Sequence, residues 1–101
     1  MNKARRQELS DVIRGLNDIQ DADDLYVWIN TLDNIKDDEQ CYYDNIPENL
    51  QSSQRAEDSE YAIDNLEEAL DFLNELYNMD EFDKDNELIQ QAIDKIEDAR
   101  W

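Results

Sequence analysis

The sequence predicts an all-α fold: an antiparallel helical hairpin with a shorter helix at each end, together forming a small helical bundle. Apolar residues recur at spacings of three and four over most of the chain, which is the period of an amphipathic helix. No segment alternates apolar and polar residues with the period of a strand, and a single Gly and a single Pro interrupt the 101 residues. A chain of this length has room for one domain, residues 1–101, with a modest core.

The first two helices are expected at about residues 3–19 and 22–44. Their apolar stripes are Leu9, Val12, Leu16 and Ile19, and then Leu25, Trp28, Leu32, Ile35 and Tyr42. Leu16 and Leu25 are nine residues apart, which rotates the second stripe away from the phase of the first. The acidic segment 21–24 between them can cap a helix N-terminus, so we expect the chain to turn there.

The last two helices are expected at about residues 53–78 and 81–99. Their stripes are Ile63, Leu66, Leu70, Leu73 and Tyr77, and then Phe82, Asp85, Ile89, Ala92, Ile96 and Ala99. Pro47 gives the one firm break, since proline disfavours a helical conformation in the preceding residue. A turn over roughly 45–52 would therefore join the two long helices into a hairpin. A homodimer would bury further apolar surface, and the sequence leaves the oligomeric state open.

The charge of the chain is strongly negative and unevenly distributed. The net charge is −19; the first twenty residues carry four basic and three acidic side chains, and the rest carry five basic and 25 acidic ones. Such a field attracts cationic partners and opposes binding to nucleic acid or to acidic lipid. No apolar segment has the ~20 residues of a membrane span, and the basic N-terminal segment lacks the apolar run of a signal peptide. One cysteine, Cys41, fits a reducing cytoplasm.

Catalysis and metal binding are not expected. The chain has no His, and Cys41 has no His partner to activate it. The carboxylates in residues 80–87 lack the central Gly of a calcium loop. We therefore expect a protein that is not an enzyme and that uses neither a metal nor another cofactor.

The third expected helix carries an acidic face opposite its apolar stripe. Its members are Glu57, Glu60, Asp64, Glu67, Glu68, Asp71 and Glu75. Acids four residues apart are separated by about 6 Å along a helix, similar to successive phosphates on a DNA strand. No basic residue occurs between Arg55 and Lys84, whereas ordinary surface helices intersperse Glu with Lys. The face is thus interpreted either as a mimic of DNA phosphates or as a solvated surface that only maintains solubility.

Further residues could belong to the same binding surface. Asp37, Asp38, Glu39 and Asp44 on the second helix would extend the acidic patch. Tyr26 and Tyr43 lie off the apolar stripe, and exposed tyrosines are favoured at protein interfaces. These two tyrosines are the expected apolar anchors beside the carboxylates.

The segment around Pro47 carries a specific pattern: Glu39-Gln40, Asp44-Asn45, Pro47-Glu48-Asn49-Leu50-Gln51, and Ser53 with Arg55. It resembles a turn signature of small acidic helical-hairpin proteins of bacteriophages and prophages. The resemblance covers about half of the chain. It implies a helical hairpin and a phage origin, and hence a location in the cytoplasm of a bacterial host, but it brings no activity with it.

Three functions are compatible with these features. The first is an inhibitor that binds a basic, nucleic-acid-binding host defence protein, such as a CRISPR effector nuclease or a restriction enzyme, and blocks DNA binding. The second is an oligomeric sponge for a nucleotide second messenger, centred on Arg55 and on the basic residues Lys3, Arg5 and Arg6. The third is an assembly module in which the apolar stripe of the hairpin pairs with another chain.

Overall fold

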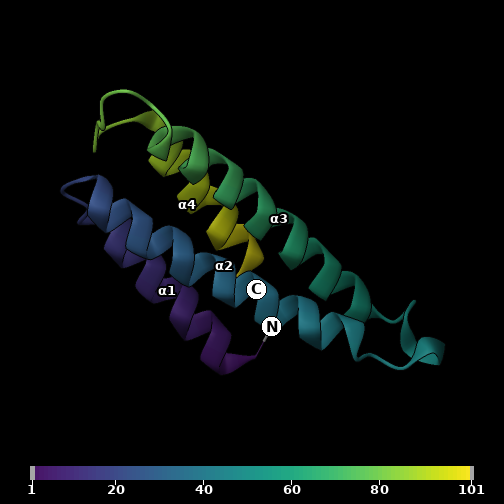
Figure 1. Ribbon diagram of the computed structural model, residues 1–101. Helices are drawn as coiled ribbons and strands as arrows, with labels where there is room; N and C mark the ends of the chain where they lie inside the picture. Colours follow the sequence, from purple (N-terminus) through teal and green to yellow (C-terminus); the bar gives the residue numbers. More distant parts are fainter. Residues whose placement is uncertain (1, 101) are drawn as a thin grey trace.

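The computed structural model describes residues 2–100 and contains four α-helices (Figure 1). They are α1 (Lys3–Asn17), α2 (Ala22–Asp44), α3 (Gln54–Tyr77) and α4 (Glu87–Ala99), with a short 3-10 helix η1 (Glu48–Leu50) between α2 and α3. Residues 2–100 contain no strand. The protein is therefore a small all-α bundle, as its sequence predicts.

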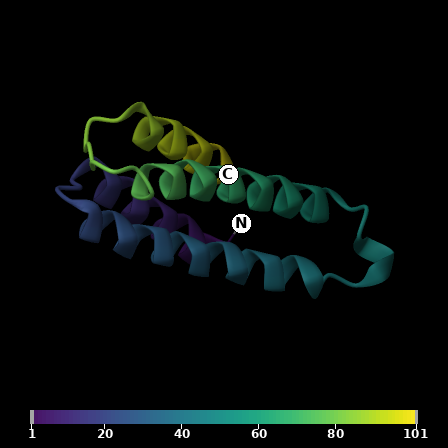
Figure 2. The same ribbon diagram turned by 45° about the horizontal axis from the view of Figure 1, so that its top comes forward.

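The two long helices form an antiparallel hairpin, and the two short helices cover only one end of it. Helix α1 packs on α2, and α4 packs on α3, so that four helices surround a common core at the end opposite η1 (Figures 1 and 2). Beyond the first turn of α1 and the last turn of α4, only α2 and α3 continue to the turn at η1 (Figure 2). We call this two-helix part, residues 43–58, the overhang. It makes the molecule elongated, with extents of 48 × 22 × 18 Å.

Each helix begins at a polar residue that caps its first turn. The side-chain oxygens of these residues accept hydrogen bonds from backbone amides two or three residues ahead. The pairs are Asn2 with Arg5 (2.7 Å), Asp21 with Asp24 (2.9 Å), Ser53 with Ala56 (3.3 Å) and Asn86 with Leu88 (2.9 Å). The expected bounds of the first three helices agree with the observed ones to within two residues.

The start of α4 differs from the expectation. The helix begins at Glu87 and not near residue 81, because Asn86 caps it and the segment before it is a turn. Within that turn, the Asp83 carboxylate accepts a hydrogen bond from the Asp85 amide at 2.9 Å, a local bond that competes with helix formation. Asp85 is exposed, so its place in the predicted apolar stripe is wrong, whereas Phe82 packs partly buried against the core.

The core is built from aliphatic side chains of all four helices. Leu9, Leu25, Leu66 and Ile96 are fully buried, one from each helix. Helices α3 and α4 make the most extensive contact, and both bring alanines to the buried side at a spacing of seven residues: Ala62 and Ala69, and Ala92 and Ala99. Small side chains at this spacing let two helices approach closely along their length. At the other edge, the Arg100 guanidinium donates a hydrogen bond of 2.7 Å to the Ser10 hydroxyl and so links the end of α4 to α1.

Within residues 2–100, no helix combines the length and the apolar character needed to cross a membrane.

Candidate functional site

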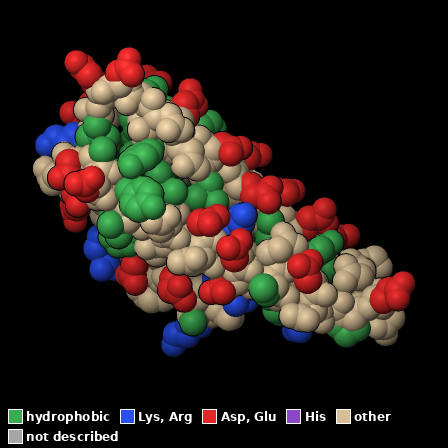
Figure 3. Space-filling view, viewed as in Figure 1, with side chains coloured by type: hydrophobic (Ala, Val, Ile, Leu, Met, Phe, Trp, Pro, Cys, Tyr) green, Lys and Arg blue, Asp and Glu red, His purple; other side chains and the backbone are tan. Residues whose placement is uncertain are grey.

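Seven of the eight acidic side chains of α3 form one continuous exposed row, which we call the α3 stripe. Its members are Glu57, Glu60, Asp64, Glu67, Glu68, Asp71 and Glu75, and all are exposed. They lie on the side of α3 opposite its buried residues, such as Leu66 and Leu73. From Glu57 to Glu75 the row extends about 27 Å along the helix axis. Figure 3 shows acidic side chains gathered along α3 on the visible face.

One member of the α3 stripe has a cationic partner. Lys95 on α4 places its Nζ 2.8 Å from the Glu68 carboxylate. The hydrogen bond that Lys95 donates to the Glu68 carboxylate, and then the negative charge of that carboxylate, raise the pKa of Lys95 above its usual value. The other six carboxylates make no ion pair with any Lys or Arg of residues 2–100. Their charges are therefore free for a partner.

Glu39 does not belong to the acidic surface, so the prediction that it is a binding residue is wrong. Its side chain is fully buried, with a carboxylate oxygen 2.9 Å from the Arg5 Nε. The Ser59 hydroxyl donates a hydrogen bond of 3.3 Å to the other oxygen. The remaining acids of α2, Asp37, Asp38 and Asp44, are exposed as expected.

Arg5 completes this buried cluster and is held away from solvent. Its guanidinium lies over the Tyr42 ring, 5.5 Å from the ring centroid, and its side chain is 14% exposed. Glu39 and Tyr42 continue the inward stripe of Leu32 and Ile35 at spacings of four and three, so the periodicity places Glu39 inside. That spacing was the signal available in the sequence.

The two predicted aromatic anchors lie far apart. Tyr26 stands near the start of α2 and Tyr43 near its end, where Tyr43 is partly buried. Tyr26 is 51% exposed and packs against Tyr77 of α3, with ring centroids 5.7 Å apart and planes inclined by 37°. Tyr77 was expected in the buried stripe but is 40% exposed, because Leu76, which is 1% exposed, takes the inward position in the last turn of α3.

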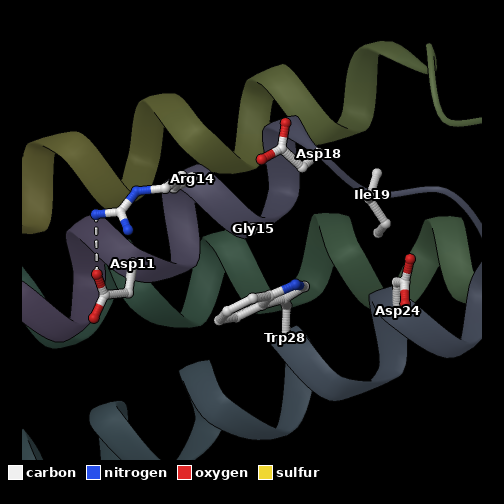
Figure 4. Close-up of a pocket in the computed structure, with 7 residues that line it drawn as sticks. All are labelled: Asp11, Arg14, Gly15, Asp18, Ile19, Asp24 and Trp28. Atoms are coloured by element: carbon white, nitrogen blue, oxygen red, sulfur yellow. Dashed lines mark hydrogen bonds and ion pairs between the residues drawn. The ribbon is translucent and has the colours of Figure 1, made fainter.

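A groove lies between the end of α1 and the start of α2 (Figure 4). It has a volume of about 580 Å³ and is lined by Asp11, Arg14, Gly15, Asp18, Ile19, Asp24 and Trp28. The Trp28 ring lies directly against Gly15, where a Cβ atom would overlap the ring carbons. Arg14 is the one basic residue in this lining, and it is paired with Asp11 at 3.2 Å.

A smaller notch of about 190 Å³ lies in the overhang and contains Arg55. Tyr42, Pro47, Leu50 and Ser53 contribute to its walls. Arg55 is exposed and makes no ion pair within residues 2–100. The Ser53 hydroxyl is engaged in capping α3.

The fold and this surface define a class: a small all-α bundle that presents an exposed acidic helix face with a neighbouring tyrosine pair. Within the described chain, no group of three or more Cys, Asp or Glu side chains is arranged to hold a metal ion. No family model, no curated protein and no solved structure matches this chain.

Proposed function

We propose that this protein is an inhibitor that occupies the cationic DNA-binding surface of a host protein through the α3 stripe. The observation that supports this most directly is the set of six exposed carboxylates on α3 that have no cationic partner within residues 2–100. Unpaired like charges along one helix destabilise it. A partner rich in Lys and Arg would remove that repulsion on binding.

The spacing of the α3 stripe favours a partner that normally binds DNA. Its successive carboxylates are three or four residues apart, except for the adjacent pair Glu67 and Glu68. Three or four residues correspond to about 4.5–6 Å along the axis. Phosphates of one DNA strand rise 3.4 Å per nucleotide and are further separated by the winding of the strand, which brings them to about the same distance. Lys and Arg side chains that contact successive phosphates could therefore contact successive carboxylates.

The resemblance of residues 37–55 to phage hairpin proteins supports a target among bacterial defence proteins. A CRISPR effector nuclease and a restriction enzyme both have a basic channel for DNA, and both act in the bacterial cytoplasm. Binding there would be fast and would weaken with salt, since charge attraction steers association.

The test is a comparison of two variants that carry the same net charge. The stripe variant contains Glu60→Gln, Asp64→Asn, Glu67→Gln and Asp71→Asn. The control variant contains Glu8→Gln, Asp80→Asn, Glu81→Gln and Glu97→Gln at exposed positions outside the α3 stripe. Each set removes four negative charges and brings the net charge from −19 to −15.

Immobilised wild-type protein is incubated with nuclease-treated bacterial lysate and eluted with short duplex DNA. We expect a DNA-binding protein that elutes with the DNA, that the control variant also retains and that the stripe variant does not. Retention of the same protein by the stripe variant, or capture that DNA does not reverse, would overturn the proposal.

The notch at Arg55 favours a second candidate function, the sequestration of a nucleotide second messenger. Arg55, which makes no ion pair within residues 2–100, offers a charge for a phosphate, and the neighbouring Tyr42 and Leu50 offer an apolar wall for a base. Calorimetric titration with cyclic dinucleotides tests it, and Arg55→Ala should abolish any binding. DNA competition at the α3 stripe should survive this substitution.

A further inference from the structure

The exposed tyrosine pair, Tyr26 with Tyr77, lies where the start of α2 meets the end of α3. Apolar side chains gather over this end of the visible face (Figure 3). Val27 and Met79, which follow the two tyrosines in the sequence by one and two residues, are also exposed, at 55% and 41%. The two rings contact each other, but each leaves about half of its surface open. Such a patch on a chain with this much charge marks a contact surface.

Carboxylates flank the tyrosine pair along α2. Asp23, Tyr26, Asn30, Asp33 and Asp37 follow one another at spacings of three and four, which places them in one exposed row. Lys36 approaches Asp33 and Asp37, at 3.7 and 3.6 Å, so the charge of that part of the row is partly balanced. Asp23, one turn before Tyr26, has no such partner within residues 2–100. An aromatic surface is thus combined with unpaired negative charge.

The charges decide which occupant fits. A second copy of this chain would bring the same acidic row against itself, and the net charge of −19 opposes that approach. A purely apolar partner would bury carboxylates without compensation. An arginine side chain satisfies both features, because its planar guanidinium stacks on aromatic rings and pairs with carboxylates.

The protein contains the same combination in its interior. Arg5 lies over the Tyr42 ring while its Nε contacts the Glu39 carboxylate. A guanidinium held between a tyrosine ring and a carboxylate is therefore an arrangement that this chain already forms. Around Tyr26 the ring and the carboxylates are present, and the guanidinium is missing.

We propose that the tyrosine pair and its flanking carboxylates bind an arginine side chain of the partner protein. This inference rests on the proposed function, since it assigns a second contact to the same basic partner. The α3 stripe would supply charge attraction that Lys and Arg satisfy alike, and the tyrosine pair would add a preference for arginine.

The test uses two fluorescent peptides, nona-arginine and nona-lysine, and measures their affinities by fluorescence anisotropy at low salt. Cation–π stacking at exposed sites contributes about 0.5–1 kcal/mol. We compare the affinity for nona-arginine with that for nona-lysine in each protein. This ratio should be about two- to five-fold larger for the wild type than for a variant without the two tyrosine rings.

Matched variants identify the source of that preference. The double substitution Tyr26→Leu with Tyr77→Leu removes the rings but keeps apolar bulk, and should abolish the additional preference. Tyr26→Phe with Tyr77→Phe keeps the rings and should retain it. Tyr61→Leu is the control, because Tyr61 is 56% exposed on α3 but lies on the side near Lys95.

Equal arginine preference in the wild type and the Leu double variant would overturn the inference. The proposed function fails in a different way. The substitutions of the stripe variant should weaken the binding of both peptides by the same factor. The proposed function is tested separately, by the competition between this protein and DNA for the host protein. A preserved arginine preference without DNA competition would reject the DNA-mimic function alone.

Discussion

Arg5 Nε and Glu39 Oε2 lie 2.9 Å apart inside the bundle, where the first turn of α1 crosses α2. Ser59 of α3 joins the pair through its hydroxyl, so three helices meet at one buried polar cluster. The cluster lies at the border between the four-helix part and the overhang. It fixes how far α1 reaches along the hairpin, since a shift of α1 by one turn would leave both charges buried and unpaired.

Substitution Glu39→Gln should therefore destabilise the fold. It leaves the Arg5 charge largely buried without a counter-charge, for which we expect a loss of about 3 kcal/mol. Replacing both partners, Arg5→Met with Glu39→Met, should destabilise less than Glu39→Gln alone. Urea unfolding followed by circular dichroism measures both, and Glu8→Gln at an exposed site is the control. A Glu39→Gln protein as stable as the control would contradict the role of the pair.

Substitution Gly15→Ala should destabilise the protein, although alanine favours a helix by about 1 kcal/mol over glycine. The added Cβ would overlap the Trp28 ring, and such overpacking costs about 1–3 kcal/mol. Trp28→Leu should remove the obstacle, so that Gly15→Ala becomes neutral or stabilising in that background. Thermal unfolding of the four proteins of this cycle gives the coupling between the two sites. Additive effects would show that the ring does not require the glycine.

The stripe variant should be more stable than the wild type at low salt. Its four amides remove several like-charge pairs at helical spacing, each worth about 0.2–0.5 kcal/mol, so we expect a gain of about 1–2 kcal/mol. Added salt screens the same repulsion and should close the gap. The control variant should gain less, because none of its four positions lies three or four residues from another on the same helix. Unfolding curves at several salt concentrations test this, and a gap that persists at high salt would contradict it.

The ion pair of Lys95 with Glu68 should contribute stability in a defined pH range. Glu68 raises the pKa of Lys95 above 10.5, mainly by its hydrogen bond and then by its charge. A pKa that is higher in the folded state gives stabilisation that is fully present below 10.5 and is lost as the pH rises through the raised value. The stability difference between the wild type and Glu68→Gln should therefore shrink at strongly alkaline pH. An NMR titration of Lys95 should show its pKa falling towards 10.5 in the variant.

The sequence predicted the helices well because most of them are defined by local features. The stripe from Ile63 to Leu73 fixes the buried side of α3, and the exposed side follows from it. The turn before α4 was not predicted because the apolar residue Phe82 lies in phase with the buried stripe of that helix. In the structure, the Asp83 carboxylate instead accepts a hydrogen bond from the Asp85 amide within a turn. A period alone does not distinguish a helix from a turn that carries one well-placed apolar residue.

The candidate site was predicted only in part, because periodicity predicts which side chains are exposed but not which residues of different helices meet. The exposure of the α3 stripe follows from periodicity, whereas the contact of Glu68 with Lys95 depends on a residue 27 positions away on another helix. The same holds for Tyr26 with Tyr77, which only the hairpin brings together. Glu39 was misplaced because an acidic side chain was assumed to be exposed, although the buried stripe passes through its position.

The overhang implies that the free energy of local unfolding differs along the molecule. Its backbone is covered by one neighbouring helix instead of several, and few aliphatic side chains, such as Ile46 and Ala56, are buried there (Figure 2). Amide hydrogens near η1 should exchange with solvent by local fraying, at a lower free energy than those of the four-helix part. The Arg5–Glu39 cluster lies at the border between the overhang and the four-helix part, so we expect local fraying to end there. Backbone amides in the four-helix part should exchange only through global unfolding.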